Sequence, residues 1–215
     1  MKPILLLSAL LALAAIAVTI TLVLLTRRRR AGSNGLDSPE KAAGRRGEVI
    51  ASSYIKYVLR AGDWLLTNVS VSFEGRQTEL DNVIINRNGV FIVEVKNYSG
   101  KLRGRADDFE WKKYHTSDVG RTYVKKVKNP LKQVRRQTYI LASYLRSRGA
   151  DVWVSGYVFL LQGNSPVSGR YVLTSDTDID RALHTAGRTQ LCSDRVRAIV
   201  RLLTGEIEDK PEKEQ

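Results

Sequence analysis

Two acidic residues and a lysine, Asp81, Glu94 and Lys96, lie close together in a segment that is otherwise rich in apolar residues. Two carboxylates that face the same way can share one metal ion, and Mg²⁺ prefers such oxygen ligands together with water and substrate phosphate. A neighbouring lysine can orient or deprotonate an attacking water, or offset the charge of a phosphate. These residue types together are what metal-assisted hydrolysis of a phosphodiester requires.

The segment 81–96 is predicted to be a β-hairpin that brings these three side chains to one face. Two runs rich in β-branched residues flank Asn88-Gly89, and both turn residues tolerate positive φ. A two-residue turn there pairs Asp81 with Lys96 and places Glu94 diagonally from Asp81, roughly 7–8 Å away. Because side chains alternate with period two, the three charged groups share a face. Both faces are largely apolar, which is typical of a sheet covered on two sides.

The same charges allow a simpler interpretation. Asp81 and Lys96 in opposite positions would form a cross-strand ion pair at the margin of a sheet, without any catalytic role. That interpretation accounts for two of the charges and leaves Glu94 without a partner. The spacing alone does not decide between the two interpretations.

The composition favours a polyanionic partner. The chain has 215 residues, enough for one good-sized domain and an appendage, and carries a formal net charge of +13 with a pI near 10.0. Such a balance favours nucleic acid or an anionic membrane surface. The single cysteine, Cys192, excludes an internal disulfide, and a structural zinc site is not expected. His115 and His184 are interpreted as surface or structural residues, and Cys192 as inert.

Residues 1–30 are predicted to anchor the chain in a membrane. The run 4–26 contains no charged residue and is long enough to span a bilayer as a helix. Arginines occupy positions 27–30, so the positive-inside rule predicts a single-pass protein with the bulk of the chain in the cytoplasm. A cleaved signal peptide is the alternative, but the apolar run is too long and the heavier basic flank follows it. Residues 31–40 are interpreted as a flexible linker.

The rest of the chain is predicted to be one mixed α/β domain over residues 41–204, followed by an acidic disordered tail over 205–215. The expected elements, in order, are a helix over 44–60, a strand over 63–72, the hairpin, a strand pair at the edge of the sheet over 98–105 and 109–114, a helix from Pro130 capped by Asn129, strands over 151–161 and 171–174, a short helix from Asp180, and a helix over 194–203 capped by Ser193. The strand at 151–161 is expected to be central.

Four motifs together resemble the NERD, or nuclease-related, domain family. They are Gly44-x-x-Gly47-Glu48 at the start of a helix, Asp81, Val93-Glu94-Val95-Lys96, and Asn129-Pro130-x-x-Gln133. The resemblance covers about residues 40–150. That family is similar to restriction-endonuclease-like enzymes with the PD-(D/E)xK motif, although Leu80 stands where the motif has proline. The resemblance implies a central mixed sheet flanked by helices and a nuclease site that uses Mg²⁺ or Mn²⁺.

By position, the resemblance implies roles for five side chains. Asp81 and Glu94 would bind the metal, and Lys96 would serve catalysis. Glu48 would reach the site from the first helix as an outer metal ligand or water-binding acid. Gln133 would complete the site from the later helix.

The segment after the hairpin is strongly basic. Residues 101–136 contain twelve Lys or Arg and four Asp or Glu, interleaved with aromatic residues. Basic side chains neutralise phosphates, and exposed aromatic rings stack on bases. The candidate nucleic-acid contacts are Lys101, Arg103, Arg105, Trp111, Lys112, Lys113, Lys125, Lys126 and Lys128. A solvated lysine-rich face, with Trp111 in the core, is the alternative.

Two functions therefore remain open. One is a membrane-anchored, Mg²⁺-dependent nuclease that hydrolyses DNA or RNA at the cytoplasmic face. The other is a non-catalytic, membrane-anchored module that uses the same fold to bind nucleic acid or a protein.

Overall fold

The computed structural model of the protein describes residues 39–117, 119–185 and 190–205. The predicted membrane anchor, most of the predicted linker and nearly all of the acidic tail lie outside these residues. Within them, no helix is both long enough and apolar enough to cross a membrane. The chain divides into two compact units, residues 1–42 and 43–215, and the fold described below belongs to the second.

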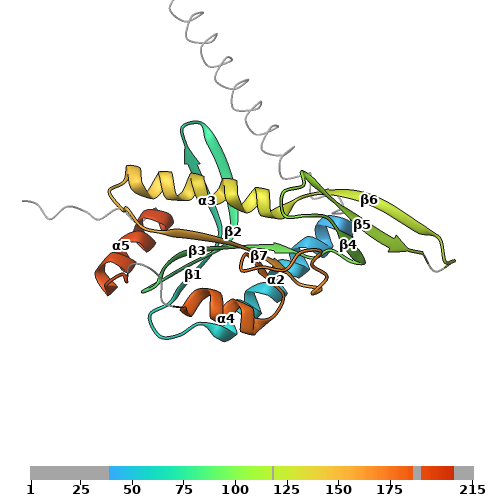
Figure 1. Cartoon of the computed structure of the whole chain (residues 1–215). Helices are drawn as coiled ribbons and strands as arrows, with labels where there is room; N and C mark the ends of the chain where they lie inside the picture. The colour runs from blue at the N-terminus through green and yellow to red at the C-terminus, as the bar shows by residue number, and fades with distance from the viewer. Residues whose placement is uncertain (1–38, 118, 186–189, 206–215) are drawn as a thin grey trace, which may run out of the picture. The chain divides into compact units, whose positions relative to one another are not determined.

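The described elements include both helices and strands, as expected of a mixed α/β domain (Figure 1). In chain order they are α2 (Pro39–Val58), β1 (Trp64–Phe73), β2 (Arg76–Asn86), β3 (Gly89–Lys96), β4 (Lys101–Arg103), β5 (Glu110–Thr116), β6 (Thr122–Lys128), α3 (Pro130–Ser147), β7 (Val154–Leu160), β8 (Val172–Leu173), α4 (Asp176–His184) and α5 (Ser193–Thr204).

The main sheet is mixed, as predicted. Its strand order is β1-β2-β3-β7-β8, with antiparallel pairing from β1 to β3 and parallel pairing from β3 to β8. β3 is central, and every residue in it except Lys96 is buried. A parallel neighbour requires a crossover connection, and the chain between β3 and β7 includes helix α3.

Helices cover both faces of this sheet. On one face Val83 and Ile92 pack with residues of α3 and α5, such as Leu141 and Ile199. On the other face, neighbouring hairpin residues such as Val93 pack with residues of α2 and α4. The two apolar faces predicted for the hairpin are therefore confirmed, and so is a sheet flanked by helices.

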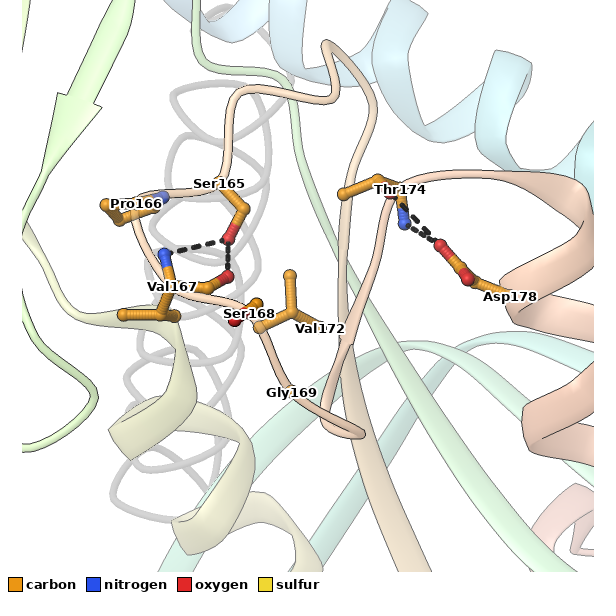
Figure 2. Close-up of a pocket in the computed structure, with 8 residues that line it drawn as sticks. All are labelled: Ser165, Pro166, Val167, Ser168, Gly169, Val172, Thr174 and Asp178. Atoms are coloured by element: carbon orange, nitrogen blue, oxygen red, sulfur yellow. Dashed lines mark hydrogen bonds between the residues drawn. The ribbon is translucent and has the colours of Figure 1, made fainter.

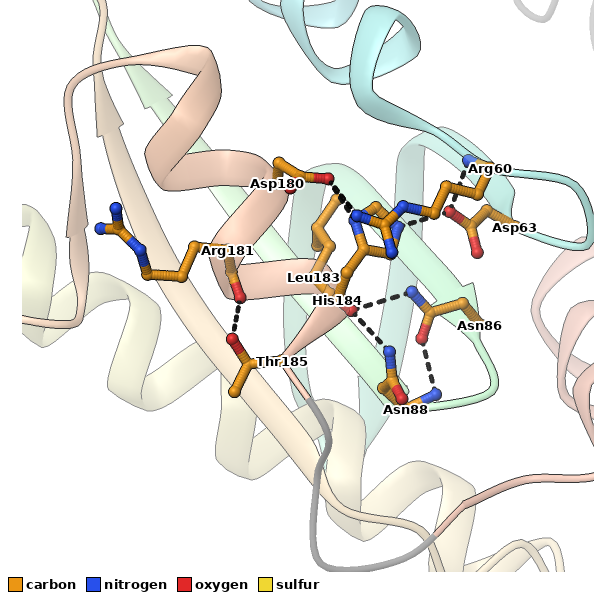
Figure 3. Close-up of polar contacts among 9 residues, drawn as sticks. All are labelled: Arg60, Asp63, Asn86, Asn88, Asp180, Arg181, Leu183, His184 and Thr185. Atoms are coloured by element: carbon orange, nitrogen blue, oxygen red, sulfur yellow. Dashed lines mark hydrogen bonds and ion pairs between the residues drawn. The ribbon is translucent and has the colours of Figure 1, made fainter.

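The predicted register of the hairpin was wrong by two residues. Asn86 pairs with Gly89, so the turn is Arg87-Asn88 and not Asn88-Gly89. The side-chain amides of Asn86 and Asn88 both donate to the carbonyl oxygen of Leu183 at 3.1 Å, at the end of α4 (Figure 3). A local bond is present as well, since Asn88 N donates to Asn86 Oδ1 at 2.8 Å. A shift of two residues keeps every side chain on its predicted face, whereas a shift of one would reverse them all.

The predicted strand pair is present as β4 and β5, but its predicted place at the edge of the main sheet was wrong. β4, β5 and β6 form a separate three-stranded sheet, and β6 was not predicted. The second edge of β3 is taken by the apolar strand β7, which leaves no place there for the polar strands. The small sheet is joined to the rest by Leu102 and Trp111, which pack against Leu131 and Leu160.

Helix boundaries differ from prediction at several points. α2 begins earlier than Gly44, and α4 begins at Asp176 because Ser175 Oγ accepts a hydrogen bond from Asp178 N at 3.1 Å. Ser193 is the first residue of α5 and not its cap. The predicted start of α3 is confirmed, since Asn129 Oδ1 accepts from Leu131 N at 3.0 Å.

His184 ties α4 to the loop before β1. Its Nε2 lies 2.8 Å from Asp63 Oδ2, its Nδ1 lies 2.7 Å from Asp180 Oδ1, and Arg60 pairs with the same Asp180 oxygen at 2.9 Å (Figure 3). The hydrogen bond from His184 lowers the pKa of Asp180. These contacts give His184 the structural role that the sequence suggested.

Candidate active site

Strand β2 separates from both of its neighbours at Asp81. Pairing with β3 ends at Asn82, and pairing with β1 skips Asn68, which has a φ of 54°. Asp81 Oδ2 accepts a hydrogen bond from the backbone N–H of Val95 at 2.9 Å. The backbone pairing of β2 with β3 ends at Asn82 and Val93, and beyond it the Asp81 side chain bonds to the N–H of Val95 in β3. This bond holds the Asp81 carboxylate beside Glu94.

Glu94 is the most enclosed of the five residues predicted for the catalytic site, with 2% of its surface exposed. Its Oε1 accepts hydrogen bonds from Lys96 Nζ, at 2.6 Å, and from Gln133 Nε2. Its Oε2 accepts from Gln137 Nε2 at 2.7 Å. A buried carboxylate is costly unless it is paired and hydrogen-bonded, and here both oxygens are satisfied.

Gln137 was not predicted as a site residue. It is 1% exposed, and its Nε2 also approaches the carbonyl oxygen of Glu79 at 3.1 Å. Its Oε1 is buried and has no hydrogen-bond partner among the described residues. The signal that could have found it is its position one helical turn after Gln133, within the otherwise apolar stripe of α3.

The electrostatics of Asp81 are dominated by burial. Burial, and then the charge of Glu94, raise its pKa from 3.8 to about 7, with a smaller contribution from Glu48 in the same direction. The hydrogen bond from Val95 and the charge of Lys96 act in the opposite direction without cancelling this shift. Near neutral pH, Asp81 and Glu94 therefore resist carrying two negative charges at once, and a cation between them would relieve that repulsion.

Lys96 is held in its charged form. Burial on its own would lower its pKa, but the charge of Glu94 and the hydrogen bond to Glu94 outweigh burial, and the pKa of Lys96 lies above its usual value. The ammonium group therefore keeps its proton at neutral pH. This favours a role in offsetting negative charge over a role in deprotonating water.

Helix α2 reaches the site because Gly47 has no side chain. A Cβ at position 47 would lie 2.8 Å from the Cβ of Asn97, the residue that follows β3. Glu48, the next residue of α2, is half-buried, and its charge acts on Asp81. The structure thus brings together Asp81, Glu94, Lys96, Glu48 and Gln133, as predicted, while the roles of these residues are a separate question.

The donor set suits a divalent cation held by few protein ligands. Among the described residues, no group of three or more His, Cys, Asp or Glu side chains could hold a metal ion, so the predicted set of three carboxylates is not assembled as a cluster. Mg²⁺ usually binds one or two carboxylates and keeps several waters. Asp81 and Glu94, with the buried unpartnered oxygen of Gln137 nearby, fit that pattern.

Comparison with known families agrees with this architecture. Residues 43–161, more than half of the chain, match the profile of the NERD, or nuclease-related, domain. The chain belongs to the NERD family. The NERD match begins in α2 and ends just after β7, so it includes all the elements that supply the site residues.

Individual relatives add little to this assignment. Over 72 residues the chain is 33% identical to an uncharacterized protein of Bacillus anthracis. The alignment covers 33% of this chain and 34% of that protein, so the chain spans about a third of the length of the curated relative it matches. No solved structure gives a significant match.

The basic segment lies between two site elements of the NERD domain. It leaves β3 just after Lys96 and enters α3 just before Gln133. The predicted contacts Lys101, Arg103, Arg105, Lys112, Lys125, Lys126 and Lys128 are exposed, and Lys113 is half-buried. Trp111 was wrongly included. It is fully buried, its ring contacts Gly104 so closely that a Cβ there would lie 2.2 Å from it, and its Nε1 donates to Arg105 O at 2.8 Å.

Two surface cavities formed by described residues lie elsewhere. One, of about 540 Å³, lies between the loop after β7 and the start of α4, and is lined by residues that include Ser165 and Asp178 (Figure 2). The other, of about 930 Å³, runs along the first half of β7. Neither is lined by Asp81, Glu94 or Lys96. The candidate site of the NERD domain is therefore not one of these pockets, which is compatible with a polymer that lies across the surface.

Two glycines of α2 provide a matched test of how the NERD domain positions Glu48. Gly47→Ala is expected to lower the free energy of unfolding by about 1–3 kcal/mol, because the added methyl group collides with Asn97. Gly44→Ala meets open space and is expected to be neutral or to stabilise by up to about 1 kcal/mol through helix propensity. Urea unfolding of both variants measures the difference. Equal stabilities would contradict the close approach of α2 to the end of β3.

Proposed function

We propose that this chain is a metal-dependent nuclease of the PD-(D/E)xK type, anchored to a membrane by residues 4–26 and active at its cytoplasmic face. The observation that carries the proposal is the convergence of Asp81, Glu94 and Lys96 on one face of β2 and β3, with Glu94 held by Gln133 from α3. A buried network of this composition has no evident purpose in packing, because an apolar set would stabilise the sheet as well or better.

In this proposal the protein side chains have separate tasks. Asp81 and Glu94 hold Mg²⁺ or Mn²⁺, and Glu48 acts as an outer ligand or binds a water. Bound there, the cation would act as a Lewis acid and lower the pKa of a coordinated water. Lys96, which keeps its proton, offsets charge on the phosphate. Gln133 and its neighbour Gln137 fix the orientation of the Glu94 carboxylate.

The pKa of Asp81 makes metal binding depend on pH. Because that pKa is about 7 without metal, a proton competes with the cation below pH 7 and is absent above it. The affinity for Mn²⁺ is expected to fall by up to about tenfold per pH unit below pH 7 and to level off above it. Calorimetric titration of the full-length protein in buffers of different ionisation enthalpy measures both the affinity and the proton released. An affinity independent of pH would show that Asp81 is not a ligand.

The activity itself is tested on the full-length protein with single- and double-stranded DNA and RNA. Cleavage is expected with Mg²⁺ or Mn²⁺ and is expected to stop when the metal is chelated. Absence of cleavage of every substrate, with the metal shown to bind, would contradict the nuclease proposal. Anchoring is tested separately, since carbonate washing should leave the full chain in the membrane and should release a chain without residues 1–30.

One observation favours the second candidate function, a non-catalytic binding module. Glu94 already has hydrogen-bond donors on both oxygens, from Lys96, Gln133 and Gln137, so its carboxylate is satisfied without any metal. In that case the protein would bind nucleic acid or a protein partner through this fold, and Glu94→Ala would bind as well as the wild type while neither protein cleaves.

A further inference from the structure

The small sheet ends in a ribbon of two strands that extends beyond the main body of the domain (Figure 1). β5 and β6 pair over their whole length, from Glu110 opposite Lys128 to Thr116 opposite Thr122. The third strand, β4, pairs only with residues 112–114 of β5. The cross-strand pairs beyond Tyr114 therefore form a ribbon only two strands wide. Every residue of β6 except Val127 is exposed.

Lysines face each other directly across this ribbon. Lys112 lies opposite Lys126 on one face, and Lys113 lies opposite Lys125 on the other. Like charges in opposite positions destabilise a strand pair. Lys126 is partly compensated by Glu110, at 3.0 Å, but both side chains are exposed and such pairs contribute little. The arrangement suits a partner that supplies negative charge to Lys112 and Lys126.

On its fully exposed face the small sheet carries a row of three cations. The register places Arg103, Lys112 and Lys126 side by side across β4, β5 and β6. With strands about 4.8 Å apart, the row is roughly 10 Å long. Arg103 also lies over the ring of Tyr114, 5.8 Å from its centre, so that this aromatic side chain is already covered on one face.

The described residues at the end of the ribbon are Ser117, Val119, Gly120 and Arg121, and Val119 is exposed. The turn is closed by hydrogen bonds from Ser117 N to Arg121 O and from Gly120 N to Ser117 O, both 2.9 Å long. The two cross-strand pairs beyond β4 extend about 7 Å along the strands at the usual rise per residue. The major groove of B-form DNA is about 12 Å wide and 8.5 Å deep and admits a two-stranded ribbon. The free end of the ribbon has the size of that groove.

We propose that the β5–β6 ribbon inserts its end into the major groove of duplex DNA, while the cations behind it contact the phosphates on either side. This inference rests on the proposed nuclease function and narrows its substrate to B-form duplex DNA. In the chain, the ribbon lies between β3, which carries Glu94 and Lys96, and α3, which carries Gln133.

Other nucleic acids fit these features less well. Single strands bind mainly by stacking bases on exposed aromatic rings. In the small sheet Trp111 is buried and Tyr114 is covered by Arg103, which leaves Tyr123 as the exposed ring of β5 and β6. Duplex RNA has a deep, narrow major groove that side chains do not enter.

Binding is measured with full-length Glu94→Ala protein, which is expected not to cleave, so that affinity does not depend on catalysis. Fluorescence anisotropy compares a DNA duplex of about 20 base pairs, either of its single strands, and the RNA duplex of the same sequence. The DNA duplex is expected to bind at least about tenfold more tightly than the other two. Dimethyl sulfate should show protection of guanine N7, in the major groove, and no protection of adenine N3, in the minor groove.

Two pairs of substitutions distinguish DNA binding by the ribbon from an effect of the net charge of the protein. Lys112→Gln with Lys126→Gln is expected to weaken duplex binding about tenfold or more at low salt and to reduce the slope of log affinity against log salt by about 1.8. Arg146→Gln with Arg148→Gln removes the same charge from the far end of α3 and is expected to change the affinity little.

The outcomes distinguish this inference from the function on which it rests. Equal or tighter binding of a single strand, protection of adenine N3 alone, or equal effects of the two substitution pairs would overturn the groove proposal even if the protein is a nuclease. Protection of guanine N7 that is lost when the ribbon lysines are replaced would support it even if the wild-type protein never cleaves.

Discussion

Glu94→Gln is expected to reduce metal-dependent cleavage by at least about 100-fold. Glutamine has nearly the shape of glutamate but no charge, so it is expected to hold a divalent cation with Asp81 much more weakly. The carboxylate that it replaces accepts hydrogen bonds from Lys96, Gln133 and Gln137, and these donors would be left around a neutral amide. Initial cleavage rates at saturating Mg²⁺ measure the loss.

A second measurement on this variant does not depend on activity. The charge of Glu94 is the second-largest cause of the raised pKa of Asp81, after burial. Glu94→Gln should therefore lower the pKa of Asp81 towards its ordinary range, which NMR titration of the Asp81 carboxyl carbon can follow. Glu79→Gln, an exposed acid on the same hairpin, is the matched control and should change neither quantity. An active Glu94→Gln protein would show that cleavage does not need the charge of Glu94. An unchanged pKa of Asp81 would show that the two carboxylates do not interact. Either result would remove the basis of the proposed site.

The hairpin shows which part of such a site can be read from the sequence. Period two in the strands was enough to put Asp81, Glu94 and Lys96 on one face, because alternation is a local property of extended backbone. The register was not local. The turn lies at Arg87-Asn88, where Asn86 and Asn88 donate to the carbonyl oxygen of Leu183, 97 and 95 residues later in the chain. As a result Asp81 lies beside Glu94 and not opposite Lys96.

That difference excludes the ion pair between Asp81 and Lys96. The predicted register allowed Asp81 and Lys96 to form a plain cross-strand ion pair that left Glu94 without a partner. In the structure Lys96 pairs with Glu94 instead, and Asp81 bonds to the backbone of Val95. The simple ion pair is therefore wrong, although the error in register did not affect which residues converge.

The predicted place of β4 and β5 and the predicted role of Trp111 were both wrong for one physical reason, which is that strands compete for the positions beside β3. The sequence shows that β7 is apolar and that β4–β6 are polar, but the edge that each occupies depends on the burial of the finished sheet. Once β7 pairs with β3, the polar strands form their own sheet and must bury at least one face of it. Trp111 and Leu102 serve that purpose, which is why the tryptophan in a lysine-rich segment is core and not a stacking platform.

Lys96→Met should reduce cleavage by about 100-fold or more while leaving metal affinity unchanged or higher. Methionine keeps most of the length of the lysine side chain and removes the ammonium group. Because that group carries the same sign of charge as the metal and bonds to Glu94 at 2.6 Å, it competes with a cation for the carboxylate. Removing it is therefore expected to weaken only the stabilisation of the phosphate. Calorimetry with Mn²⁺ and cleavage assays on the same preparation separate the two effects.

Lys96→Arg then distinguishes the two chemical roles of the lysine. The pKa of Lys96 is raised, since the charge and hydrogen bond of Glu94 outweigh burial, so the group is charged over the whole neutral range. A residue that acts through its charge should be replaced in part by arginine, although the larger guanidinium group fits the same space less well. Arginine should accordingly retain more activity than methionine, with the same dependence on pH as the wild type. If arginine and methionine were equally inactive, and the wild-type rate rose with pH well above the pKa of Asp81, Lys96 would be acting as a base, and the charge-based mechanism would have to be replaced.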